Sequence, residues 1–172
     1  MDKIQVYTPE IEPDVEKIIE SKEFKVFLGG TIDNGSSDDW QAKVEEALDK
    51  RIGSRGFVVM NPRREHWDSK AGREAILKQI DWEQKCLTAS DAIMIVFLDG
   101  SQSPISLLEL GLFAKTGKVT VFCTDKYYRY DNVEDTCKRY NVKLVNSNDA
   151  EDIATEIMRR SYAHMTETYK PE

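Results

Sequence analysis

Phe-Lys-Val-Phe-Leu-Gly-Gly, at residues 24–30, is a short apolar run that ends in two glycines. Such a run predicts a buried strand. Gly29 and Gly30 let the backbone turn tightly and let a ligand approach closely. A polar loop follows at 31–37, and a helix is expected from about Asp38. A strand, a glycine turn and a helix in this order are typical of the opening of an α/β fold.

The rest of the chain continues this alternation. Four further apolar runs predict strands, and helical segments separate them. The run at 91–97 is the most apolar, so we place it at the centre of the sheet. The expected strands cover residues 24–28, 56–60, 91–97, 118–123 and 142–145. The sequence therefore predicts an α/β fold with a doubly wound, five-stranded parallel sheet and right-handed crossovers.

Residues 1–23 differ from the segments that follow them. They hold a short β-like piece at 4–7, two prolines and a brief helical segment, and we expect an N-terminal arm laid over the domain. Residues 24–161 are the expected domain, since no linker, repeat or low-complexity stretch divides them. Residues 162–172 are expected to form a loosely held tail.

Composition and charge limit the classes of function. The chain has 172 residues and a net charge of -7, with 40% hydrophobic and 32% charged residues, as in soluble globular proteins. Without a basic block, we expect no nucleic-acid partner. No apolar signal region begins the chain, and no apolar run is long enough to span a membrane. Three cysteines without CxxC spacing indicate free thiols, so we expect a cytoplasmic protein. The positions of the two histidines match no metal-ligand pattern, which predicts no metal site.

The helix expected at 104–114 contains one carboxylate, Glu109. Its large apolar residues cover almost the whole circumference, which predicts a helix buried on all sides. A buried carboxylate is costly unless it is paired or protonated. A buried arginine or backbone amides could hold Glu109, or the carboxylate could serve chemistry, and the helical pattern alone leaves both interpretations open.

A second carboxylate faces the same interior. Glu83 falls on one stripe with Ile80 and Leu87 in the helix expected at 73–89. The alternative is that Glu83 reaches solvent from the end of this stripe. Asp81 lies about a hundred degrees away by the helical period and flanks the stripe.

These carboxylates come from the helices on either side of the central strand. The glycine turn and the loops that begin at Asn61 and Ser101 open at the same edge of the sheet, where open parallel sheets bind ligands. Two acids around a pocket suit displacement at an anomeric carbon. One acid acts as nucleophile, and the other moves a proton on the leaving group.

Five motifs resemble the nucleoside 2-deoxyribosyltransferase-like family, and the likeness covers roughly residues 24–160. The most specific of them is Leu-Glu-Leu-Gly (108–111). The others are Phe-Leu-Gly-Gly-Thr-Ile (27–32), Asn-Pro-Arg-Arg (61–64), Asp-Trp-Glu (81–83) and Ser-Asp-Ala-Ile-Met-Ile-Val (90–96). The resemblance implies a flavodoxin-like fold, no cofactor, and a nucleoside or nucleotide substrate with a free nucleobase as acceptor.

The resemblance also implies residue roles. Glu109 would attack C1′ of a 2′-deoxynucleoside and form a covalent deoxyribosyl-enzyme, which a second base or water resolves. Glu83, eight positions before Asp91, would protonate the leaving base, with Asp81 as the other candidate. Asn132 would reach the site of a neighbouring subunit, which implies a homo-oligomer, a dimer or larger, with shared active sites.

Ser103 departs from the family pattern. Typical transferases carry an Asp at this position, six before the nucleophile, where it binds the sugar 5′-hydroxyl, whereas a Ser there meets the phosphate in the related 5′-monophosphate N-glycosidases. Ser103 could instead merely cap the helix that follows it.

The expected substrate-binding residues are Gly29, Gly30, Thr31, Asn61, Arg63, Ser103 and Asn132. The leading interpretation is a nucleoside 2-deoxyribosyltransferase; the alternatives are a 5′-monophosphate N-glycosidase and a non-catalytic nucleotide-binding module.

Overall fold

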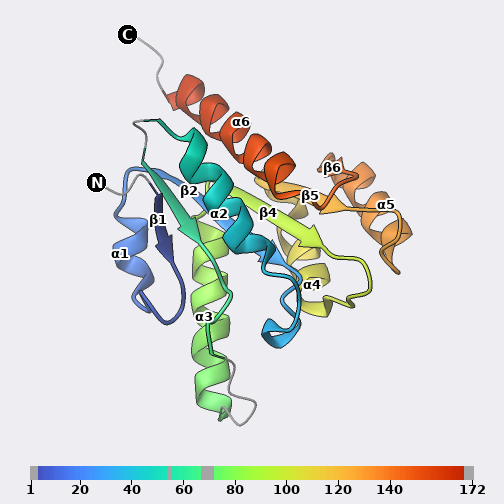
Figure 1. The fold of residues 1–172 in the computed structure, drawn as a ribbon, viewed down its shortest axis with the longest axis horizontal. Helices are drawn as coiled ribbons and strands as arrows, with labels where there is room; N and C mark the ends of the chain where they lie inside the picture. The colour runs from blue at the N-terminus through green and yellow to red at the C-terminus, as the bar shows by residue number, and fades with distance from the viewer. Residues whose placement is uncertain (1–3, 54–55, 67–71, 169–172) are drawn as a thin grey trace.

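Six parallel strands form one sheet between two layers of helices in the computed structural model, which describes residues 4–53, 56–66 and 72–168 (Figure 1). The order across the sheet is β1-β3-β2-β4-β5-β6. The strands are β1 (Ile4–Tyr7), β2 (Phe24–Gly30), β3 (Phe57–Met60), β4 (Ala92–Phe97), β5 (Val119–Cys123) and β6 (Lys143–Val145). Without β1, the remaining five strands lie in the order β3-β2-β4-β5-β6, which is the strand order of flavodoxin-like folds.

The predicted number of strands is wrong by one. β1 pairs in parallel with β3, with Ile4 opposite Phe57 and Tyr7 opposite Met60, and so adds a sixth strand at the edge of the sheet. The sequence indicates a β-like piece here, but four residues carry no signal for the strand with which they pair. The domain boundaries expected at 23 and 161 stay predictions. The last helix continues without a break to Thr168.

The two faces of the sheet are covered by different helices (Figure 1). Alternate strand residues point to opposite faces, so Phe27 and Ile95 pack in one core and Leu28 and Val96 in the other. The first core is covered by α1 (Val15–Ile19), α3 (Arg73–Ala89), α4 (Pro104–Phe113) and α5 (Tyr130–Tyr140), and the second by α2 (Trp40–Arg51) and α6 (Ala150–Thr168).

The centre of the sheet is formed by β2 and β4. Every residue of β4 is buried, which confirms the central position predicted from its apolar run. Gly30 of β2 pairs with Val96 of β4 at a φ of 140°, and a Cβ on Gly30 would lie 2.2 Å from the Val96 carbonyl oxygen. Only glycine fits this close approach of two backbones.

α4 differs from its prediction. The expected helix buried on all sides is wrong, because Ile105, Leu108 and Leu112 are each more than half exposed. Only one face of α4, including Glu109 and Leu110, is buried against the sheet. The helix belongs to one of the two helix layers, and the side chains of Ile105, Leu108 and Leu112 lie on its solvent-exposed side. No described helix is long and apolar enough to cross a membrane.

Candidate active site

A cavity of about 510 Å³ opens at the carboxyl ends of β2 and β4. The strand order reverses between these two strands, and open α/β sheets bind ligands at such a point. The volume suits a small-molecule ligand. The lining residues are Gly29 and Gly30 of β2, Ile32, Asp33, Asn34 and Pro62 of two loops, Ile76, Gln79, Ile80 and Glu83 of α3, and Ser103, Pro104, Ile105, Ser106 and Glu109 at α4.

Glu109 projects into this cavity from the buried face of α4, and only 5% of its surface is exposed. A Cβ on Gly29 would lie 3.4 Å from Glu109 Oε2, so the bare glycine backbone leaves room for the carboxylate. Burial, followed by the charge of Glu83, raises the pKa of Glu109 to about 8. A buried arginine or backbone amides would lower this pKa, so the raised value argues against a purely structural carboxylate.

Glu83 lines the same cavity from α3, as its place on the apolar stripe predicts. Burial raises its pKa, and two interactions partly oppose this effect: Gln79 Nε2 donates a hydrogen bond of 2.8 Å to Glu83 Oε1, and Arg64 contributes its positive charge. The charge of Glu83 also raises the pKa of Glu109, so the ionisation of Glu83 favours a protonated Glu109. The structure therefore brings together the two acids that the sequence singled out.

Asp81 lies elsewhere. Its carboxylate forms an exposed ion pair of 2.7 Å with Lys85, one turn further along α3. It does not line the cavity around Glu109. Of the two candidate acids in α3, the geometry thus favours Glu83.

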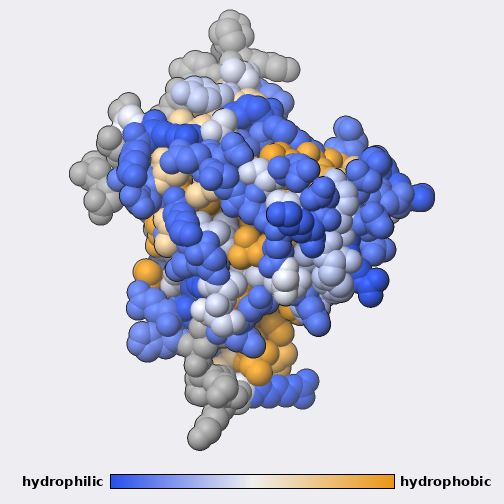
Figure 2. Space-filling view, turned by 45° about the vertical axis from the view of Figure 1, so that its right-hand side comes forward, coloured by the Kyte–Doolittle hydropathy of each residue, from blue (hydrophilic) through white to orange (hydrophobic). Residues whose placement is uncertain are grey.

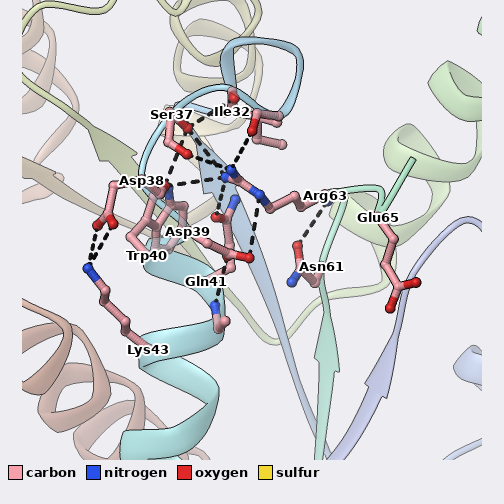
Figure 3. Close-up of polar contacts among 12 residues, drawn as sticks. Ile32, Ser37, Asp38, Asp39, Trp40, Gln41, Lys43, Asn61, Arg63 and Glu65 are labelled. Carbon is pink, nitrogen blue, oxygen red and sulfur yellow. Dashed lines mark hydrogen bonds and ion pairs between the residues drawn. The ribbon is translucent and has the colours of Figure 1, made fainter. Parts of the chain in front are cut away.

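Arg63 has a structural environment that sequence reasoning missed. Its guanidinium lies against the loop after β2, where it donates hydrogen bonds to the carbonyl oxygens of Ser37 (2.6 Å) and Gly35 (3.2 Å) and to Gln41 Oε1 (Figure 3). An ion pair with Asp39 completes this set, and only 10% of the side chain is exposed. The arginine fixes the loop and does not line the cavity.

Asn61 also turns away from the cavity. Its Nδ2 donates a hydrogen bond of 2.8 Å to Glu45 in α2. Its Oδ1 accepts a hydrogen bond from the Arg63 backbone amide (Figure 3). The neighbouring Pro62 lines the cavity instead. The loop lies at the expected edge of the sheet, but the side chains of Asn61 and Arg63 make hydrogen bonds within the fold and do not line the cavity.

Thr31 and Ser103 meet at the loop end of the cavity. Their hydroxyl oxygens are 2.6 Å apart, and both residues are buried. Ser103 has a left-handed backbone with a φ of 45°, and its hydroxyl makes no capping bond to α4. The interpretation of Ser103 as a simple helix cap is therefore wrong, because its hydroxyl is directed to other side chains.

Sequence reasoning missed Asp33 and Asn34, which line the cavity in the turn after β2. Both adopt positive φ angles, of 49° and 53°. Aspartate and asparagine are the non-glycine residues that tolerate this conformation best. An Asp-Asn pair separated from the glycine turn by two residues was therefore a usable signal.

Asn132 lies on α5, exposed and outside the cavity. It borders a separate groove with Leu107, Leu110 and Arg129. Within one chain, the structure does not bring Asn132 to Glu109.

An apolar surface borders the mouth of the cavity. Ile76 and Ile80 of α3 and Ile105 of α4 line the cavity and are each about half exposed, and Leu108 and Leu112 continue this surface along α4. Figure 2 shows apolar side chains gathered in the lower part of the molecule. We call these five residues the apolar rim.

Comparisons with known proteins show the family of this chain. A family model described as nucleoside 2-deoxyribosyltransferase like matches residues 23–127, more than half of the chain. This span includes Glu83, Ser103 and Glu109 but ends before Asn132. No curated protein matches the chain. The crystal structure of a conserved protein from Enterococcus faecalis V583 is similar with a TM-score of 0.56 and 16% identity, over 80% of this chain and 99% of that chain, a likeness in fold.

Proposed function

The chain belongs to the nucleoside 2-deoxyribosyltransferase-like family, and on this premise we propose that it is a nucleoside 2-deoxyribosyltransferase. It would cleave the N-glycosidic bond of a 2′-deoxynucleoside and transfer the sugar to another free nucleobase. The observation that carries this proposal is the pair Glu109 and Glu83, two carboxyl groups with raised pKa values that line one cavity.

The first half of the reaction uses both acids. A Glu109 oxygen attacks C1′, and the bond between C1′ and the base nitrogen breaks with its electron pair passing to the base. Glu83 donates a proton to the leaving base, so the base departs neutral. The product is a deoxyribosyl ester on Glu109.

The second half reverses these roles. A nitrogen of the incoming base attacks C1′, Glu109 leaves with the electron pair of the ester bond, and Glu83 accepts the proton that the incoming base loses. With water in place of the base, the same steps give hydrolysis, so an N-glycosidase remains the alternative activity.

The reaction depends on which of the two carboxyl groups, Glu109 or Glu83, holds a proton. Burial and the charge of Glu83 favour a protonated Glu109 in the empty site, whereas the reaction needs an ionised Glu109 and a protonated Glu83. Positive charge develops on the sugar at C1′, next to Glu109, and it favours the ionised carboxylate there. The site thus stabilises the transition state more than the free state, as catalysis requires.

Two assays separate the candidate functions. A transferase mixed with thymidine and free adenine yields 2′-deoxyadenosine, whereas an N-glycosidase releases base and free sugar without an acceptor, and chromatography distinguishes these products. Glu109→Gln should abolish turnover in both cases. If wild-type protein exchanges or releases no base from any 2′-deoxynucleoside or its 5′-monophosphate but still binds them, the non-catalytic module is the better description.

We further propose a homo-oligomer with shared sites. The apolar rim exposes five large side chains beside the cavity, and monomeric proteins rarely expose contiguous patches of this kind. A neighbouring copy on this surface would enclose the cavity, and Asn132 could then serve the site of that copy.

A further inference from the structure

Hydroxyl groups and a carboxylate form a hydrogen-bonded relay at the loop end of the cavity. The Leu98 backbone amide donates to Thr31 Oγ1 (3.0 Å), and Thr31 Oγ1 lies 2.6 Å from Ser103 Oγ. Ser103 Oγ lies 2.9 Å from Ser101 Oγ, which donates to Asp33 Oδ1 (2.8 Å). The relay thus joins the loop after β2 to the loop after β4.

The two ends of this relay fix the direction of every hydrogen bond in it. A backbone amide can only donate and a carboxylate can only accept, and each hydroxyl has a single proton. Ser101 gives its proton to Asp33, so Ser103 must donate to Ser101. Thr31 must then donate to Ser103, and this agrees with the amide of Leu98 donating to Thr31.

The consequence concerns what Ser103 can offer a ligand. Its proton is committed to Ser101, so toward the cavity it has a lone pair and no donor. Asp33, which also lines the cavity, carries a negative charge. No lysine or arginine is among the described residues that line the cavity, and the nearby Arg63 is held by the loop after β2.

We infer that this relay makes the loop end of the cavity an acceptor of hydrogen bonds, so that Asp33 and Ser103 select a free sugar hydroxyl over a phosphate. The inference rests on the proposed function: the base must lie next to Glu83, which leaves the loop end for the sugar. A hydroxyl can donate to Ser103 or Asp33. A phosphate would bring negative charge beside Asp33, and no hydroxyl proton of the relay would be free to meet it.

The backbone conformation also indicates that the surrounding structure holds these residues in place. Asp33, Asn34 and Ser103 all adopt positive φ angles, which are uncommon for residues other than glycine. Such conformations persist where the surrounding structure over-determines them. Here the relay and the cavity meet at these residues.

The test is equilibrium binding to the full chain carrying Glu109→Gln, which blocks turnover. Titration calorimetry compares thymidine with thymidine 5′-monophosphate and 2′-deoxyadenosine with its 5′-monophosphate. The nucleoside should bind at least about tenfold more tightly than its monophosphate in each pair that binds, the order expected for one hydrogen bond to a charged group. Equal or tighter binding of the monophosphates would overturn the inference alone, whereas no binding of any probe would overturn the proposed function with it.

Second-site variants isolate the relay. Asp33→Asn keeps a residue suited to positive φ, and it should shift the nucleoside-to-monophosphate ratio toward the monophosphate by about tenfold. Ser101→Ala should shift it in the same direction, because it frees the Ser103 proton. Asp99→Asn is the matched control, since Asp99 also accepts from a hydroxyl, that of Thr124, but does not line the cavity. Equal shifts in Asp33→Asn and Asp99→Asn would indicate a general charge effect and contradict the relay.

Discussion

Glu109 illustrates at the scale of one residue how burial sets both stability and chemistry. Its pKa is raised from 4.5 to about 8, so the folded protein holds a proton that the unfolded chain releases between these values. The free energy of unfolding therefore falls as pH rises from about 4.5 to about 8. At about 1.4 kcal/mol per pKa unit, the loss is roughly 3–5 kcal/mol.

Glu109→Gln should remove this dependence. The variant should be similar to wild type near pH 4.5 and increasingly more stable up to pH 8, as measured by urea unfolding at several pH values. Glu156→Gln is a control of opposite sign: burial raises the pKa of Glu156, but hydrogen bonds from Arg159 and Lys143 outweigh it and lower the pKa to about 2. That variant should be less stable than wild type at neutral pH and approach it only in strong acid. A Glu109→Gln difference that does not change with pH would contradict the buried proton.

Glu83 should determine the alkaline side of the pH profile of kcat/KM. The active form has an ionised Glu109 and a protonated Glu83, so the profile should be bell-shaped. Its alkaline limb should lie where Glu83 loses its proton, above the ordinary range of a glutamate because burial raises the pKa of Glu83. In Glu83→Gln only Glu109 titrates, so the alkaline limb should disappear and the acid limb should lie below pH 8. The rate should also fall much more for natural bases than for a nucleoside with an activated leaving group. An unchanged alkaline limb would exclude Glu83 as the acid.

At the scale of elements, the glycine turn that ends β2 connects the sheet to the site. Gly29→Ala would place its Cβ 3.2 Å from the Phe27 ring and 3.4 Å from Glu109 Oε2. The fold can accommodate these contacts, but the added methyl group would occupy space that a sugar bound at Glu109 needs. We expect a small loss of stability, below about 1.5 kcal/mol, and a marked fall in kcat/KM. Gly30→Ala would strike the Val96 backbone at 2.2 Å, so it should lower the free energy of unfolding by about 3 kcal/mol or more. Thermal unfolding and steady-state assays of the pair separate the two effects, and equal stabilities would contradict this account.

Element patterns also explain which parts of the structure could be predicted. The buried run of β4 and the stripe that places Glu83 inward depend on local periodicity, so they were predictable from the sequence. The pairing of β1 with β3 depends on contacts more than fifty residues apart, and no local pattern encodes it. The turn of Arg63 toward the loop after β2 depends on loop geometry, as does the relay to Asp33. A side chain in a loop can point either way with the same sequence around it.

At the scale of the whole molecule, the proposed oligomer can be tested through the apolar rim. The apolar rim predicts an oligomer in sedimentation velocity, and replacing Leu108 and Leu112 by Glu should shift it toward the monomer, since both side chains are more than half exposed in one chain. If Asn132 serves a neighbouring site, Glu109→Gln protein should be inactive and Asn132→Ala protein weakly active, and a mixture unfolded and refolded together should regain up to about a quarter of the wild-type rate for a dimer. No regain in the mixture would contradict shared sites.

The most direct test of the central claim is intact-mass spectrometry of the protein after brief mixing with a 2′-deoxynucleoside and no acceptor base. The account predicts a population heavier by one deoxyribosyl unit, with peptide mapping that places the ester on Glu109. The added mass should disappear when a free base is supplied, and it should never form on Glu109→Gln. Base exchange by wild-type protein without any added mass, or with the sugar on another residue, would contradict the assignment of Glu109 as the nucleophile.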